Sequence, residues 1–201
     1  MMPATPTLLG IAVLVGYLLG SIPFGLIFSF AFGIGDIRKI GSGNIGATNV
    51  LRSGNKIAAA LTLFCDAGKG ALVVFLARHW FDETVVVIAA GSVIVGHLFP
   101  VWLKFKGGKG VATSAGILLS IALPAGLCIG ATWLTVFFVS RYSSLAALTS
   151  AVVAPVAMYF LSTPLHAEFA VFIALVVFLT HEKNIRRLLN GTESRFSFNK
   201  S

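Results

Sequence analysis

Long apolar segments separated by short polar stretches occupy most of the chain. They cover residues 7–32, 57–77, 84–103, 110–123, 125–140, 142–161 and 165–181. A helix needs roughly 20 apolar residues to cross the hydrocarbon core of a bilayer. The pattern therefore predicts an all-α, polytopic integral membrane helical bundle of about seven transmembrane helices. No repeat or change of composition divides the chain, so we expect a single domain, residues 1–201.

The fourth and fifth segments are hard to separate by hydrophobicity alone. The run "ILLSIALPAGLCIGATWLTVFFV" (117–139) reads either as one kinked span or as two short spans that turn at Pro124 and Gly126. Two spans are favoured because the combined run is too long for one crossing.

The positions of the basic residues predict how the bundle is oriented. With seven spans, loops 33–56 and 104–109, the turn at Arg141 and the C-terminal tail all lie on one side. Every Lys and Arg falls there, except Arg78 on the other side and Lys69 within a span. Positive charge marks the cytoplasmic side, so we expect the N-terminus outside and the C-terminus in the cytoplasm.

Composition narrows the classes of protein that fit this pattern. The chain is 57% hydrophobic and only 11% charged, whereas about a quarter of the residues of a soluble domain are charged. Its net charge of +8 is better explained by cytoplasmic loops, anionic headgroups or anionic substrates than by nucleic acid. Cys65 and Cys128 both lie in apolar runs and suggest neither a disulfide nor a zinc site.

The first glycine segment, "KIGSGNIGATNVLR" (39–52), is far more polar than its surroundings. Glycines allow backbone N–H groups to approach an anion closely, short polar side chains add donors, and an arginine can bind phosphate with two hydrogen bonds. A capped helical hairpin is the simpler alternative, but it leaves Arg52 unexplained. The candidate phosphate-binding side chains here are Ser42, Asn44, Thr48, Asn49 and Arg52.

The second glycine segment, "FKGGKG" (105–110), follows "GHLFPVWLK" and precedes a predicted span. Two ammonium groups beside free N–H groups at a helix N-terminus could hold a phosphate. The spacing is not that of a Walker A loop, and the alternative is charge that only sets topology. His97 could serve chemistry or only the membrane interface. The candidate residues are Lys106, Gly107, Gly108, Lys109 and Gly110.

Two further polar groups stand out. His181 and Asn184 in "HEKNIRRLLNGTE" (181–193) share one face of a continuing helix and could orient a hydroxyl or accept its proton, although a lone interfacial histidine is an alternative. Asp66 and Lys69 lie within a predicted span, three residues apart. Because intramembrane charges are costly, we expect these two to form a structural ion pair.

Several catalytic patterns are absent from the sequence. It contains no H-x-x-x-x-D acyltransferase motif and no G-x-S-x-G nucleophile elbow. Its few acidic residues are too scattered to hold Mg²⁺. We therefore expect neither a metal nor another cofactor.

Together and in this order, the three motifs resemble those of the bacterial acyl-phosphate:glycerol-3-phosphate acyltransferases of the PlsY type. The likeness covers essentially the whole chain, including "SIPFG" (21–25), "DAGKG" (66–70) and "SRYSSL" (140–145). It implies a seven-span enzyme of the bacterial inner membrane with a cytoplasmic active site. Such an enzyme would transfer a fatty acyl group from acyl phosphate to the 1-hydroxyl of glycerol 3-phosphate, an early step of phospholipid biosynthesis. The products would be lysophosphatidic acid and inorganic phosphate.

The resemblance also implies roles for the candidate residues and partners for the chain. Ser42, Thr48, Arg52 and Lys109 would hold the phosphate of glycerol 3-phosphate. Backbone groups of Gly107, Gly108 and Gly110, with Asn44, Asn49 and Lys106, would receive the acyl phosphate. His181 and Asn184 would orient the glycerol hydroxyls and, with Lys109, form the catalytic set. The proton could leave to His181 or to a substrate phosphate. Membrane lipid and an enzyme that produces acyl phosphate would be the functional partners.

A small membrane transporter for phosphorylated solutes is the alternative from another class. It predicts cationic residues on the outer side and along a path through the spans, and the outer loops hold no such vestibule. A non-catalytic lipid-binding scaffold gives no reason for two phosphate-binding segments.

Overall fold

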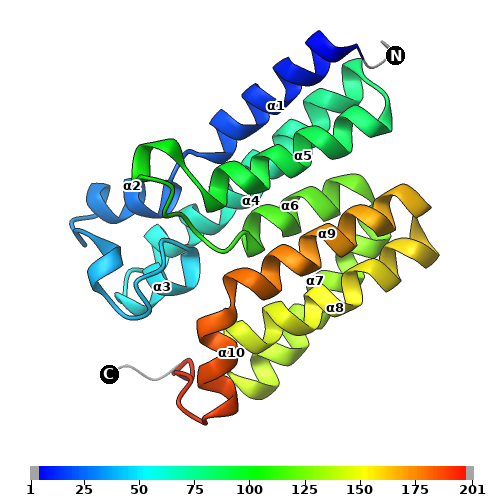
Figure 1. Ribbon diagram of the computed structural model, residues 1–201. Helices are drawn as coiled ribbons and strands as arrows, with labels where there is room; N and C mark the ends of the chain where they lie inside the picture. Colours follow the sequence, from blue (N-terminus) through cyan, green and yellow to red (C-terminus); the bar gives the residue numbers. More distant parts are fainter. Residues whose placement is uncertain (1–4, 198–201) are drawn as a thin grey trace. The chain divides into compact units, whose positions relative to one another are not determined.

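The structure is a computed structural model that describes residues 5–197, and its elements in this range are helices (Figure 1). The all-α fold predicted from the sequence is confirmed. The chain divides into two compact units, Met1–Ser120 and Ile121–Ser201, which are described separately. The single domain 1–201 stays a prediction.

In the part of the chain that the structure describes, the first unit holds six α-helices and two short 3₁₀ helices. They are α1 (Pro6–Gly20), α2 (Phe24–Ala31), η1 (Ile37–Lys39), α3 (Ala47–Arg52), α4 (Lys56–Trp80), α5 (Glu83–Leu98), η2 (Val101–Leu103) and α6 (Val111–Ile121), which ends at the boundary. The second unit holds α7 (Leu123–Ser140), α8 (Ser143–Leu161), α9 (Pro164–Thr180) and α10 (Glu182–Leu189).

The helices bear out a multi-pass membrane protein. Within residues 5–197, five segments are long and apolar enough to cross a bilayer: Pro6–Ala31, Lys56–Trp80, Glu83–Leu103, Leu123–Ser140 and Ser143–Leu161. The helix α9 meets the same test only together with α10, across a bend of 64°. The 11 residues of α6 measure roughly 16 Å, about half the thickness of the hydrocarbon core. The count of seven spans and the orientation of the two ends therefore stay predictions.

Prolines separate consecutive apolar helices at two places. Pro23 is the N-cap of α2, so the predicted apolar segment 7–32 is two helices joined at Ser21–Pro23. Pro124 lies in the first turn of α7, where its missing N–H costs no helical hydrogen bond. The chain therefore breaks at Ala122, as two segments require, whereas Gly126 is a buried residue of α7 and not part of the turn.

Glycines bring α1 and α5 into backbone contact. Gly16 and Gly20 lie one turn apart on α1, and a Cβ on Gly20 would collide with the carbonyl of Val93 in α5. On the facing helix, a Cβ on Gly96 would collide with the carbonyl of Tyr17. Small residues at this spacing allow helices to approach closely where the apolar solvent gives no hydrophobic drive for association.

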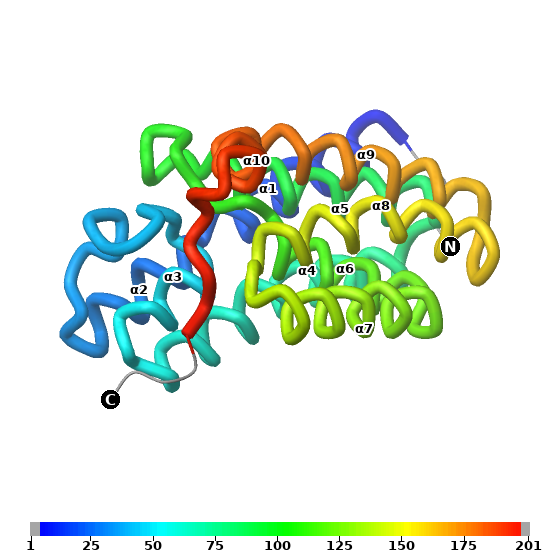
Figure 2. Tube along the Cα trace, turned by 90° about the horizontal axis from the view of Figure 1, so that it is seen from below, coloured from blue at the N-terminus to red at the C-terminus, as the bar shows by residue number. Residues whose placement is uncertain are grey.

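Glycines also bring α4 and α6 into backbone contact. A Cβ on Gly70 would lie 2.6 Å from the carbonyl oxygen of Thr113, and one on Gly116 would collide with the backbone of Ala67. In the second unit, α8 lies between α7 and α9 and contacts both (Figure 2). Its buried face is rich in alanine, which lets both neighbours pack near the α8 backbone: Ala146, Ala147, Ala151, Ala154 and Ala157.

We expect Gly20→Ala to lower the free energy of unfolding by about 1–3 kcal/mol, because the new methyl group forces α1 away from the Val93 carbonyl. Gly10→Ala is the matched control, since a Cβ at this position of α1 has nothing within 4 Å. Thermal unfolding of the purified variants in detergent measures the difference. Equal midpoints for the two variants would show that the backbones of α1 and α5 do not touch.

Candidate functional site

Asn49 organises the first glycine segment from its centre. Its side chain is buried, and its Nδ2 donates to the carbonyls of Ile37, Ile40 and Asn44 over 2.8–3.0 Å. Its Oδ1 accepts from the N–H of Ser42 over 2.9 Å. One amide side chain therefore holds both sides of the loop before α3, and its hydrogen-bonding capacity is used within the protein.

The other polar side chains of this segment differ in what they can offer a ligand. The Oδ1 of Asn44 accepts from the Gly46 N–H over 2.7 Å, which makes a local turn. Ser42 is exposed, and Thr48 and Arg52 are half-buried. A Cβ on Gly41, whose φ is +56°, would lie 2.5 Å from the Oδ1 of Asn49 and 3.4 Å from the Cδ of Arg52. Glycine at this position therefore lets the Arg52 side chain lie over the loop.

The second glycine segment folds back onto the C-terminal end of α5. The N–H groups of Gly107 and Gly108 donate to the carbonyls of Leu98 and His97 over 2.9 and 3.0 Å. These carbonyls belong to the last turn of a helix and would otherwise lack a partner. In this structure the two amides cap α5, so they are occupied as donors, and the assignment of both glycines to phosphate binding remains a prediction.

The rest of the second glycine segment faces the start of α6. Gly110 has a φ of +81° and immediately precedes Val111, the first residue of α6. Among residues 5–197, no hydrogen-bond partner is present for its backbone N–H. Lys106 is exposed and Lys109 half-buried, so both ammonium groups have access to solvent near this helix terminus.

Both glycine segments lie at the same end of the first unit (Figure 1). The helices α4 and α5 are in contact and are joined by a short turn at Phe81–Asp82, so the start of α4 and the end of α5 adjoin. Leu103, just before the second segment, packs against a buried cluster that includes Ile45 and Val50 from the first. One apolar core thus supports both segments.

Asp66 and Lys69 form a buried ion pair within α4. The Nζ of Lys69 lies 2.9 Å from an Oδ1 of Asp66, and both side chains are at most 4% exposed. The same Nζ donates to the carbonyl of Ile22 over 3.0 Å and lies 2.9 Å from the Nδ1 of His97. The sequence singled out the first two residues as a pair, whereas the third member, His97, comes from α5.

In the second unit, His181 ends α9 and precedes α10. Its ring is buried, and its Nδ1 lies 2.8 Å from the carbonyl oxygen of Val177. A carbonyl can only accept, so Nδ1 carries the proton and the lone pair of the neutral ring is on Nε2. This tautomer suits a group that accepts a proton or a hydrogen bond from a hydroxyl.

Asn184 is held by an acid that sequence reasoning did not connect to it. Its Nδ2 donates to an Oε1 of Glu193 over 2.6 Å, and Ser144 in α8 and Arg187 donate to the same carboxylate over 2.7 and 2.6 Å. Burial raises the pKa of Glu193, but the hydrogen bonds from Ser144, Asn184 and Arg187 outweigh burial and leave this pKa below its ordinary value. The residue in the sequence that points to this contact is Gly191. Its φ of +69° lets the chain turn back after α10 and brings Glu193 to Asn184.

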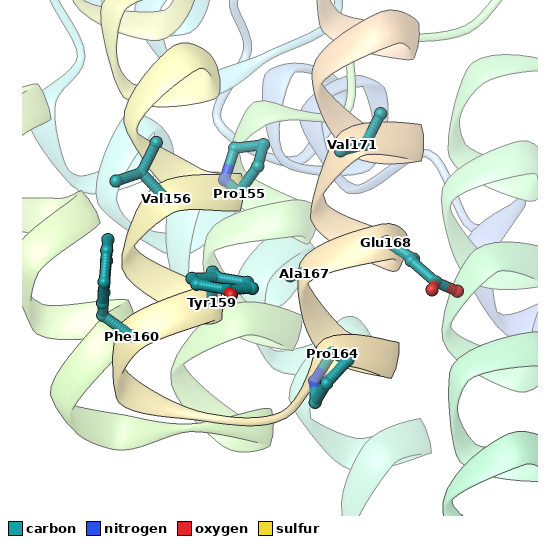
Figure 3. A pocket seen from close by; sticks show the side chains of 8 residues that line it. All are labelled: Pro155, Val156, Tyr159, Phe160, Pro164, Ala167, Glu168 and Val171. Atoms are coloured by element: carbon teal, nitrogen blue, oxygen red, sulfur yellow. The ribbon is translucent and has the colours of Figure 1, made fainter.

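In the second unit, an open groove of about 430 Å³ lies between α8 and α9, and neither His181 nor Asn184 lines it (Figure 3). Its lining is largely apolar, and Glu168 points away from α8 in this view. The groove surrounds the start of α9 at Pro164, whereas His181 follows the other end of the helix, roughly 25 Å along its axis. We assign no part of the site to it.

Within residues 5–197, no group of three or more His, Cys, Asp or Glu side chains is arranged to hold a metal ion. The side chains with access to a ligand are hydroxyl, ammonium, guanidinium, imidazole and amide groups. This chemistry suits the binding of phosphate and the activation of a hydroxyl group.

Known proteins match nearly the whole chain. A protein-family model described as glycerol-3-phosphate acyltransferase matches residues 10–191. The glycerol-3-phosphate acyltransferase of Mesorhizobium japonicum is 56% identical over 185 residues, which cover 92% of this chain and 94% of that protein. The protein of the same name from Caulobacter vibrioides is 57% identical over 190 residues, or 93% of this chain and 87% of that one.

Solved structures point to the same family as the sequence relatives. A crystal structure of PlsY, an integral membrane glycerol 3-phosphate acyltransferase, in its glycerol 3-phosphate form matches with a TM-score of 0.89 at 36% identity, covering 94% of this chain and 96% of that one. The lysophosphatidic acid form of that protein matches with a TM-score of 0.87 at the same identity, over 94% and 95% of the two chains. With sequence and fold in agreement over this length, the chain belongs to the PlsY-type glycerol-3-phosphate acyltransferase family.

Proposed function

We propose that this protein transfers a fatty acyl group from acyl phosphate to the 1-hydroxyl of glycerol 3-phosphate. The observation that carries the proposal is the pair of glycine segments at one end of the first unit, supported by one apolar core. Two anionic headgroups need two sets of donors, and the acyl chain of one substrate needs a membrane-embedded protein. The glycerol 3-phosphate and lysophosphatidic acid forms of the related structure support the same substrate and product here.

The proposed reaction converts a mixed anhydride, acyl phosphate, into a carboxylate ester. The 1-hydroxyl oxygen of glycerol 3-phosphate attacks the acyl carbonyl carbon, the bond from this carbon to the phosphate oxygen breaks, and inorganic phosphate leaves. The hydroxyl proton passes to the Nε2 of His181 or to the departing phosphate. Acyl phosphate is already activated, so positioning and charge stabilisation account for the catalysis without a covalent enzyme intermediate.

The proposed roles in the first unit follow the chemistry and the solvent access of each side chain. Ser42, Thr48, Arg52 and Lys109 hold the phosphate of glycerol 3-phosphate. The Gly110 N–H and Lys106 receive the head of acyl phosphate, next to the turn made by Gly107 and Gly108. Asn44 and Asn49 serve both headgroups indirectly, because their hydrogen bonds shape the first glycine segment.

In the second unit, His181 and Asn184 take the role of orienting the glycerol hydroxyls. The lone pair on Nε2 of His181 supports this role, since it can accept from a hydroxyl. The hydrogen bond to Glu193 fixes the Asn184 amide so that its Oδ1, which can only accept, is turned away from that carboxylate. The carboxylate therefore acts as the support of the amide and not as a base.

We further propose that both glycine segments lie on the cytoplasmic face of a bacterial inner membrane, where soluble glycerol 3-phosphate is available. Acyl phosphate is a reactive mixed anhydride, so an enzyme that produces it is the expected functional partner. The alternative of a transporter for phosphorylated solutes is not supported by the membership of this chain in an acyltransferase family.

The donor is tested with purified protein in detergent, glycerol 3-phosphate, and either acyl phosphate, acyl-CoA or acyl-carrier-protein thioester. We expect release of inorganic phosphate and formation of lysophosphatidic acid in equal amounts with acyl phosphate alone. Turnover with a thioester at a comparable rate would contradict the proposed donor. No transfer from any of the three would contradict the proposed function.

Arg52→Ala should raise the KM for glycerol 3-phosphate by roughly 10–100-fold, because a charge-assisted hydrogen bond to phosphate contributes about 1.5–3 kcal/mol. Arg186→Ala is the matched control, because Arg186 is an exposed arginine that pairs with Glu182 on the surface of α10. Initial rates over a range of glycerol 3-phosphate concentrations measure both variants. An unchanged KM for the Arg52 variant would remove this residue from the phosphate site.

Asn49→Ala and Ser42→Ala should separate loop organisation from ligand contact. The first removes four hydrogen bonds around a buried amide, so we expect a lower unfolding midpoint together with lost activity. The second removes an exposed hydroxyl, so we expect a raised KM for glycerol 3-phosphate at an unchanged midpoint. The reverse pattern would mean that Asn49, and not Ser42, contacts the substrate.

A further inference from the structure

The Lys69 ammonium joins three parts of the first unit that are distant in sequence. Its Nζ donates to the carbonyl of Ile22 between α1 and α2, lies 2.9 Å from the Nδ1 of His97 in α5, and forms an ion pair with Asp66 in its own helix α4. An ammonium group has three protons and no lone pair, so it can only donate to the imidazole nitrogen. In the resulting tautomer His97 accepts through Nδ1, and the ring proton is on Nε2.

His97 contacts Gly108 of the second glycine segment in two ways. Its backbone carbonyl accepts from the Gly108 N–H over 3.0 Å. The Nε2 of its ring occupies the space that a Cβ on Gly108 would need. Among residues 5–197, Nε2 has no hydrogen-bond partner, and His97 is only 5% exposed. Any shift of the ring would therefore change the position of Gly108 directly.

We propose that His97 is a positioning residue of this enzyme: its ring, held by the buried Lys69–Asp66 pair, fixes Gly108 and thereby the second glycine segment with Lys109. The conformation of the chain between His97 and Gly108 supports this role. Lys104 and Phe105 both adopt positive φ, 51° and 61°, a conformation that residues other than glycine rarely adopt. Such a turn needs support from its surroundings, and the contacts of His97 with Gly108 supply it at the returning end.

This inference rests on the proposed function, because it assigns the supported segment to phosphate binding. Lys109 directly follows Gly108, so a displaced Gly108 moves the ammonium group and the start of α6 together. A displacement of about 1 Å in such a site can lower activity by roughly 100-fold. The buried ion pair then serves the site through His97 although neither charge touches a substrate.

A double-mutant cycle between His97 and Gly108 tests the proposal. Gly108→Ala introduces a methyl group against the ring, and we expect it to raise the KM for glycerol 3-phosphate or lower kcat by roughly 100-fold in total. His97→Asn keeps an acceptor for Lys69 but removes the end of the ring, and a loss of about 10-fold is expected. The double variant should be no worse than Gly108→Ala alone, because the shortened side chain leaves room for the methyl group.

The control cycle pairs His97→Asn with Gly68→Ala on the open face of α4, where a Cβ has nothing within 4 Å. We expect the second substitution to leave kcat and KM unchanged in either background. Losses at His97 and Gly108 that simply multiply would overturn the proposal. So would a His97→Asn variant with a lowered unfolding midpoint but unchanged kcat and KM, which is the signature of a purely structural residue.

If Gly108→Ala alone does not fold, the same coupling is measured as the yield of monodisperse protein. Recovery of folded protein in the His97→Asn background supports the proposal, and failure to recover it contradicts the contact. Stabilisation of each variant against heat by glycerol 3-phosphate gives a readout that needs no acyl donor. Absence of acyl transfer by the unmodified protein would then overturn the proposed function, while an additive cycle in this binding readout would overturn the role of His97.

Discussion

A buried ammonium group in a membrane bundle must find every hydrogen-bond partner inside the protein, and this requirement organises the first unit around Lys69. An unpaired charge inside a membrane-spanning bundle is costly in free energy. The ion pair with Asp66 neutralises the charge within α4. The remaining donors reach the break between α1 and α2 and the end of α5, so the elements next to both glycine segments are tied to one nitrogen atom.

Glycine has two structural roles in this chain. Within the bundle, Gly16, Gly20 and Gly96 remove side chains so that helix backbones touch, which is the main source of helix association in lipid. In the loops, Gly41 and Gly108 remove side chains so that Asn49 and His97 can lie against the backbone. The same residue type therefore gives close helix packing in one place and a tightly shaped loop of the candidate site in another.

Polar side chains at the candidate site divide into those that shape the backbone and those that can meet a ligand. Asn49 and Glu193 are buried and saturated with internal hydrogen bonds, so their part is to hold Ser42 and Asn184 in place. Ser42, Arg52, Lys106 and Lys109 keep access to solvent. An enzyme that acts on an activated donor depends on this kind of preorganisation more than on a strong base or nucleophile.

The sequence alone determined the helical membrane fold, the break near Pro124, the polar motifs and the pairing of Asp66 with Lys69. These features depend on hydrophobicity and on spacing within one or two helical turns, which are local properties. Only the tertiary structure decided that His97 completes the Lys69 site, that Glu193 returns to Asn184 and Ser144, and that Gly107 and Gly108 cap α5. Each of these contacts joins residues brought together by helix crossings and chain reversals, and the side-chain packing that sets such geometry leaves no periodic signal in a single sequence.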